Sequence, residues 1–290
     1  MSVNRRRFLT IAACFAATPA LAQRRSWRGR AFGAEVEITL QGPQDVMREA
    51  FAATQQVIGQ MERRFSLFRS GSEIAVLNRT GVSIPSGPFL RLMQLADRAH
   101  DLTDGLFDPT VQPLWRARAE GLELQEARAR VGWDRVRFDE RHVVLGEGQQ
   151  LTFNGIAQGF ATDAVAEMLV ERGFENALVN IGEHRALGGP WRLGLADPDH
   201  GLLATRTITQ GAIATSSPMA TPLPGGGHIL HPDATARWST VSVEAETAAM
   251  ADALSTGLVM ADMALVRKVR RADGVRRITL VDAEGNLTSI

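Results

Sequence analysis

The sequence predicts an α+β fold in which mixed, mostly antiparallel sheets pack against helices. Val36, Ile38 and Leu40 alternate with polar residues, which is the period of a half-buried strand. Segments 46–61 and 89–99 carry apolar residues at helical spacing instead. Helices and hairpin-connected strands therefore intermix along the chain, which favours α+β over a doubly wound parallel sheet.

The remaining elements follow from the same two periods. With 290 residues, of which 44% are hydrophobic, the chain can bury a sizeable core. Gly105 is expected to help end the second helix. Further helices are expected at 160–172 and 248–260, strands at 177–181, 191–195, 212–214 and 241–243, and hairpins at 136–145 and 278–287.

Residues 1–22 are expected to form an export signal, and residues 23–290 the folded domain. Arg5 and Arg6 precede an apolar run that is shorter than the roughly 20 residues a membrane helix needs. The small residues Ala20 and Ala22 then offer a cleavage site. The pattern resembles a twin-arginine signal, which predicts a periplasmic protein that uses the export machinery. The alternative is a lipid anchor on Cys14, although Cys14 lies inside the apolar run.

Composition excludes several function classes. Lys and Arg together number 32, as do Asp and Glu, so no basic surplus indicates nucleic-acid binding. Cleavage after Ala22 would remove three arginines and the lone Cys14, leaving a net charge of about −3. A mature chain without a thiol has no cysteine nucleophile, iron–sulfur cluster or thiolate zinc site.

Four stretches have residues suited to chemistry. The first is the turn 105–110, where Gly and Pro place Asp108 at the tip. The Asp108 carboxylate could accept hydrogen bonds from an amide or a sugar of a ligand. The alternative is an Asx-turn that only caps its own backbone.

The second stretch, 154–163, is a glycine-rich turn that opens a helix. Such a helix N-terminus suits a phosphate, because amides and the helix dipole both favour an anion. Neither a dinucleotide fingerprint nor a P-loop lysine is present. The alternative is simple close packing of a strand-to-helix turn.

The third stretch is a pair on the late helix. Asp252 and Thr256 are spaced i, i+4, so their side chains share one face. A carboxylate beside a hydroxyl is a hard-oxygen pair suited to magnesium near phosphates. The alternative is a solvated helix face on which Thr256 bonds back to a carbonyl.

The fourth stretch, 228–232, begins with His228 after the glycine run 225–227. A histidine there could act as a general base, although a lone histidine is more often structural. The spacing of His184, His228 and His231 matches no zinc signature.

Six ordered blocks of the chain, taken together, resemble the ApbE family, the FAD:protein FMN transferases. The blocks are FSLF with SEI and LN at 65–78, GLFDPTVQPLW at 105–115, NGIAQGFATD at 154–163, LVNIG at 178–182, ATSS at 214–217 and ADALST at 251–256. They extend over nearly the whole mature chain. The resemblance implies a T-fold-like α+β fold that holds FAD in a cleft, with Mg²⁺ on its pyrophosphate.

The resemblance also assigns site residues. The metal ligands would be the carbonyl of Ala157 and the side chains of Asp252 and Thr256, and His228 would be the catalytic group. FAD contacts would come from Phe32, Ser66, Leu67, Phe68, Asp108 and Gln158.

The activity that the resemblance implies is Mg-dependent transfer of FMN from FAD to a Thr or Ser hydroxyl, with release of AMP. The acceptor would be a flavoprotein of an exported or membrane electron-transfer system. Two alternatives stay open, namely a periplasmic FAD-binding or trafficking protein and a Mg-dependent FAD pyrophosphatase. A flavin redox enzyme ranks last, because no dinucleotide fingerprint is present.

The chain departs from the family pattern at several positions, which indicates a divergent branch. Gln158 replaces the usual lysine and so removes a positive charge near the pyrophosphate. The other departures are Phe32 for methionine, Glu183 and His184 at the end of the LVNIG block, Ser217, Pro218 and Met219 after the ATS residues, and His231 for aspartate.

Overall fold

The computed structural model describes residues 23–290, so the export signal predicted for residues 1–22 lies outside the described part. Its centre is one eight-stranded sheet in which every strand pair is antiparallel. In spatial order the strands are β1 (Arg24–Ala31), β2 (Ala34–Gln41), β6 (Ala177–Ile181), β7 (His184–Leu187), β10 (Gly211–Ser216), β11 (Thr240–Ala245), β12 (Val275–Val281) and β13 (Leu287–Ser289). This arrangement confirms the predicted α+β class with mostly antiparallel sheets.

Helices and two small sheets surround this sheet. The helices are α1 (Gln44–Phe65), α2 (Glu73–Thr80), α3 (Gly87–Leu102), α4 (Gln112–Glu120), α5 (Gln125–Ala129), α6 (Ala157–Glu171), α7 (Ala248–Leu258) and α8 (Met263–Arg270), with 3₁₀ turns η1 (Pro109–Val111), η2 (Trp133–Arg135) and η3 (Pro218–Ala220). One small sheet joins β3 (Val82–Ser83), β5 (Val143–Val144) and β4 (Arg137–Phe138), and the other pairs β8 (Trp191–Asp197) with β9 (Gly201–Ile208).

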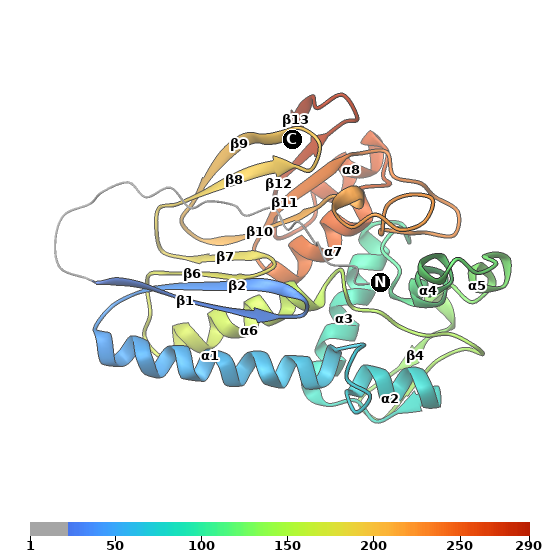
Figure 1. Ribbon diagram of the computed structural model, residues 1–290, viewed down its shortest axis with the longest axis horizontal. Coiled ribbons are helices and arrows are strands. Elements are labelled where there is room, and N and C mark those ends of the chain that lie inside the picture. The colour runs from blue at the N-terminus through green and yellow to red at the C-terminus, as the bar shows by residue number, and fades with distance from the viewer. Residues whose placement is uncertain (1–22) are drawn as a thin grey trace.

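The two faces of the large sheet carry different layers (Figure 1). Helices α1, α6 and α7 cover one face, and the β8–β9 hairpin lies over the other. The main core contains a cluster of stacked and edge-on rings from Phe65, Phe89, Phe153 and Phe160. A second, smaller core under the hairpin includes Trp191. Because α6 and α7 sit between the sheet and other helices, they are apolar almost all round.

The helices and strands predicted from periodicity are present, with ends that differ by a few residues. Helix α6 begins at Ala157, three residues before the predicted start. Gly105 does help to end α3, because it adopts a φ of 85° and its amide donates to the His100 carbonyl at 2.9 Å. The prediction did not include β1, β3, β7, β9, α2, α4, α5 or α8.

Within residues 23–290, none of the helices combines the length and the apolar character that crossing a membrane would require.

Candidate functional site

The site is built where α6 crosses α7. Gly159 allows the close approach, since a Cβ there would lie 2.3 Å from the Ala248 carbonyl oxygen. Asp163, one turn further along α6, accepts hydrogen bonds from the amides of Ala248 at 2.8 Å and Ala249 at 2.9 Å. Its carboxylate thereby caps the N-terminus of α7, and Arg185 of β7 forms an ion pair with it. These contacts fix the first turn of α7 against the start of α6.

Asp252 is placed by this crossing beside the N-terminus of α6. Its side chain is buried, and Oδ2 accepts a hydrogen bond from the Gly159 amide at 3.1 Å. Burial raises the pKa of Asp252 to about 7, helped by the negative charge of Asp163 and opposed by the Gly159 hydrogen bond. Among the salt bridges of the described residues, none involves Asp252. A buried carboxylate without a cationic side chain favours the binding of an external cation.

Glu183 is a second buried carboxylate in the same place. It lies in the turn between β6 and β7, and Oε2 accepts a hydrogen bond from the Thr215 amide of β10 at 3.1 Å. Burial, and next the charge of Asp252, raise the pKa of Glu183 well above its ordinary value. Sequence reasoning noted Glu183 only as a departure from the family pattern. No spacing rule joins it to Asp252, because the sheet brings together residues 69 positions apart.

Thr256 also faces the large sheet. Its hydroxyl lies 3.2 Å from the Ser216 hydroxyl at the end of β10, which in turn lies 2.8 Å from the Ser255 hydroxyl. The hydroxyl that bonds back to the carbonyl of Asp252 is that of Ser255, at 3.0 Å. The Thr256 hydroxyl therefore lies toward the end of β10, and its role as a metal ligand stays a prediction.

The donor set fits a divalent cation of the magnesium type. The residues assigned by resemblance, Ala157, Asp252 and Thr256, lie at the α6–α7 crossing, and all offer oxygen ligands. No group of three or more His, Cys, Asp or Glu side chains in residues 23–290 could hold a metal by itself. Mg²⁺ commonly uses one or two carboxylates and completes its shell with substrate phosphates and water. The zinc alternative finds no support in the described residues.

The start of α6 differs in one respect from a typical phosphate-binding helix N-terminus. The amides of Ile156 and Ala157 donate to the Phe153 carbonyl, and that of Gly159 donates to Asp252. These amides are therefore already used within the chain. The carboxamide of Gln158 lies directly against Gly182, since a Cβ at Gly182 would be 2.8 Å from the carboxamide atoms. The φ of Gly182 is 92°, a backbone conformation that favours glycine. A phosphate here would meet the Gln158 side chain rather than those three amides.

Asp108 caps its own turn, as the structural alternative states. Oδ1 accepts from the amide of Thr110 at 2.7 Å and from its hydroxyl at 2.6 Å, and Oδ2 accepts from the Trp133 amide at 3.3 Å. The turn nevertheless borders the site, because a Cβ at Gly257, the residue after Thr256, would lie 3.1 Å from Phe107. The Asx-turn is thus present, and a contact between Asp108 and FAD stays a prediction.

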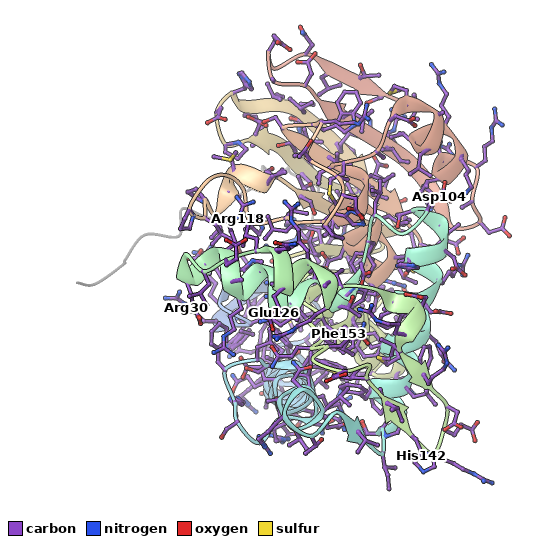
Figure 2. The ribbon with its side chains drawn as sticks, turned by 90° about the vertical axis from the view of Figure 1, so that its right-hand side faces the viewer. Arg30, Asp104, Arg118, Glu126, His142 and Phe153 are labelled. Atoms are coloured by element: carbon purple, nitrogen blue, oxygen red, sulfur yellow. The ribbon has the colours of Figure 1, made fainter. Side chains whose placement is uncertain are left out.

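The backbone carbonyl of Pro218 binds His228 at two points. Both its amide, at 3.0 Å, and its Nδ1, at 2.8 Å, hydrogen-bond to the oxygen of Pro218. The glycine run before it is tied by Arg118 of α4, labelled in Figure 2, which donates to the carbonyls of Pro224 and Gly225. Pro218 lies two residues after Ser216, so His228 is connected to the Thr256 side of the site.

The other two histidines of the zinc alternative lie in different surroundings from each other. His231 is half-buried, and burial lowers its pKa, opposed by the charges of Asp108 and Asp233. His184 is buried on β7 beneath the β8–β9 hairpin, and burial lowers its pKa to about 4.

The remaining predicted FAD contacts gather at the C-terminal end of α1. Phe32 sits in the β1–β2 turn with a φ of 50°, and its amide donates to Glu62 at 3.3 Å. Ser66 ends α1, and its hydroxyl accepts from the amide of Phe68 at 3.2 Å. Leu67 packs against the core, whereas the Phe68 residue is 86% exposed. These residues therefore lie together at the end of α1, where Phe65 packs edge-on against Phe160 of α6.

Comparison with known proteins finds one family throughout. The profile of the ApbE family matches residues 32–278. The chain is 30% identical over 179 residues to the FAD:protein FMN transferase of Klebsiella pneumoniae (strain 342), covering 56% of this chain and 57% of that protein. It is 28% identical over 240 residues to the FAD:protein FMN transferase of Vibrio cholerae, covering 71% of each.

Solved structures share the fold over nearly the whole chain. The crystal structure of the ApbE protein from Thermotoga maritima is 27% identical, with a TM-score of 0.82, and the match covers 92% of this chain and 96% of that one. The flavin transferase ApbE from Vibrio cholerae has a TM-score of 0.80 at 24% identity, covering 93% and 97%. Because the family profile spans most of the sequence, this chain belongs to the ApbE family.

Proposed function

We propose that this protein transfers FMN from FAD to a threonine or serine hydroxyl of an acceptor flavoprotein, releasing AMP. The observation that carries the proposal is the buried pair of carboxylates, Asp252 and Glu183, at the α6–α7 crossing. Two buried carboxylates attract a cation, and Mg²⁺ would supply the missing positive charge while the oxygens of a pyrophosphate complete its ligand shell.

Different residues of the chain would bind the metal, the phosphates and the rest of FAD. Ala157, Asp252 and Thr256 would hold Mg²⁺, which would neutralise the pyrophosphate charge and stabilise the leaving group. Gln158 would donate an amide hydrogen bond to a phosphate oxygen, where the family's usual lysine would add a charge. The end of α1 with Phe32 and Ser66 to Phe68 would bind the rest of FAD.

The bond changes are those of a phosphoryl-type transfer. The acceptor oxygen forms a bond to the phosphorus on the riboflavin side, and the bond from that phosphorus to the bridging oxygen breaks. AMP leaves with the bridging oxygen, and the hydroxyl proton passes to His228 as general base. The Pro218 carbonyl can only accept a hydrogen bond, so Nδ1 of His228 is the donor of that bond, and Nε2 is the ring nitrogen that would take the proton.

Mass spectrometry of an acceptor domain tests the transfer. The purified protein, residues 23–290, is incubated with FAD, Mg²⁺ and a flavin-acceptor domain, and the acceptor is digested. The expected result is one FMN added to a threonine or serine, with one AMP released per label. Omission of Mg²⁺ should abolish both products.

The same reaction separates the two alternatives. AMP release without any labelled acceptor would support a Mg-dependent FAD pyrophosphatase, in which water replaces the hydroxyl. FAD binding with neither product would support an FAD-binding or trafficking protein. Either outcome would replace the transferase proposal.

The location of the protein is a separate proposal. Arg5, Arg6 and the small residues at 20 and 22 support export by the twin-arginine route to the periplasm, with a mature N-terminus near Gln23. Its acceptor would then belong to an exported or membrane electron-transfer system. Peptide sequencing of the protein from the periplasmic fraction tests this, and an uncleaved cytoplasmic product or a lipidated Cys14 would contradict it.

A further inference from the structure

A buried carboxylate outside the proposed metal site lies at the end of β8. Asp197 is fully buried, and its two oxygens accept four hydrogen bonds. Oδ1 accepts from the amides of Asp199 at 2.9 Å and His200 at 3.1 Å, and Oδ2 accepts from the hydroxyls of Ser239 and Thr240, both at 2.6 Å. Burial raises the pKa of Asp197, but these hydrogen bonds outweigh it and hold the pKa below its ordinary value. Asp197 is thus a satisfied anion that acts only as an acceptor.

The Asp197 carboxylate fixes which of the neighbouring hydroxyls donates in each hydrogen bond. Thr240 has one hydroxyl proton, and it donates that proton to Asp197. The hydroxyls of Ser217 and Thr240 lie 2.6 Å apart, and both are buried. Because the Thr240 proton is already used, Ser217 must be the donor of this second bond. The orientation of Ser217 is therefore set by Asp197 through Thr240.

Ser217 in turn precedes the residue that holds His228. The carbonyl of Pro218 accepts from the amide and from Nδ1 of His228, at 3.0 and 2.8 Å. Gly227 makes this approach possible, since a Cβ there would lie 2.7 Å from the Pro218 oxygen. Ser217 and Pro218 are adjacent in the chain, so the hydrogen bond of Ser217 bears on the position of the Pro218 carbonyl, which in turn binds the imidazole.

We propose that Asp197, Thr240 and Ser217 form a positioning relay that fixes the orientation and the tautomer of His228. None of the three touches the reacting atoms, so they are positioning residues and not catalytic ones. The relay belongs to this chain in particular, because Ser217 stands where the resembling family block has a glycine, which has no hydroxyl. Its part in FMN transfer rests on the function proposed above.

The test pairs two variants with a matched control. Ser217→Ala and Thr240→Val each remove one hydroxyl with little change in shape, whereas Thr240→Ser keeps the hydroxyl. Nitrogen NMR of the protein labelled with ¹⁵N-histidine reports the tautomer, and His228→Gln assigns the signal. Steady-state kinetics of FMN transfer give kcat and the KM for FAD.

The relay predicts one pattern in both measurements. The wild type and Thr240→Ser should show a single tautomer with the proton on Nδ1, and Ser217→Ala and Thr240→Val should show a mixture. In the two relay variants kcat should fall about tenfold, because a misplaced base loses near-attack geometry. The KM for FAD should stay within about twofold of the wild type, since uniform binding is not affected.

The outcomes that overturn the relay are distinct from those that overturn the transfer. If His228 keeps its tautomer in Ser217→Ala, the relay is wrong, whatever happens to kcat. If the wild type transfers no FMN, the proposed function fails, while the NMR signals still decide the relay. Should Thr240→Val not fold, the smaller change Ser217→Ala decides alone.

Discussion

Gly159 lies against the backbone of Ala248 with no room for a side chain, since a Cβ there would be 2.3 Å from the Ala248 carbonyl oxygen. This contact allows α6 and α7 to approach closely. The two helices carry Ala157, Asp252 and Thr256, so the whole proposed metal site depends on that close approach.

We therefore expect Gly159→Ala to destabilise the protein. The added methyl meets backbone atoms, which cannot move aside cheaply, so overpacking should lower the free energy of unfolding by about 1–3 kcal/mol. Urea unfolding followed by circular dichroism measures it. Gly71→Ala is the matched control, because a Cβ at Gly71 meets nothing within 4 Å. An equal loss of stability in both variants would show that the α6–α7 contact is not the cause.

Asp252→Asn should change metal affinity and stability in opposite directions. The amide oxygen of asparagine can still accept the Gly159 hydrogen bond, so the fold is kept. The negative charge is lost, and Mg²⁺ affinity in the presence of ADP should fall by at least about tenfold. At pH 8 the metal-free variant should be more stable than the wild type, because a buried ionised carboxylate is removed.

Calorimetry and urea unfolding at pH 8 measure the two effects on the same samples. Unchanged Mg²⁺ affinity would place the cation elsewhere in the molecule. A loss of stability would mean that the Asp252 carboxylate already has a compensating charge in the metal-free protein.

Glu183→Gln should weaken Mg²⁺ binding although no family motif assigns Glu183 to the metal. Glu183 is buried beside Asp252, so its charge adds to the attraction for a cation at that point. Loss of that charge should weaken Mg²⁺ binding by about tenfold, as is typical of a group outside the ligand shell. Glu171→Gln, at the exposed end of α6, is the control and should leave the affinity unchanged. Equal affinities for wild type and Glu183→Gln would show that Glu183 does not act on the cation.

Periodicity predicted the buried parts of the fold well, because burial creates the pattern. The alternation in β2 and the apolar faces of α1 and α3 are direct records of a core on one side. Strand β1 was missed since four arginines project from this edge strand, and only its pairing with β2 makes it a strand. Helix α8 has only two buried residues, so its short apolar stripe was not recognised.

The site could be predicted only in part, because local spacing rules relate residues of one helix but not residues of different strands. Asp252 and Thr256 lie on one helix, so a spacing rule was sufficient to join them. Glu183 and Ser216 join the site only through strand order in the large sheet, which no local rule describes. The hydrogen bonds of Asp108 show a second reason why the sequence does not predict the whole site. A turn that suits a ligand also suits its own backbone, and the sequence alone does not decide between them.

His184 should make the stability of the protein depend on pH below neutrality. Burial lowers the pKa of His184 to about 4, from 6.5 in an unfolded chain, so the folded state holds the ring neutral. Between these two values the unfolded chain binds the extra proton, and stability therefore falls as the pH falls from 6.5 toward 4. The expected loss from this residue is about 2 kcal/mol between pH 7 and pH 5. His184→Leu removes the titrating group, and the difference between variant and wild type in urea unfolding at the two pH values isolates its share from that of other groups. The variant should lose about 2 kcal/mol less than the wild type on going to pH 5, and parallel losses would show that His184 is accessible to protons in the folded state.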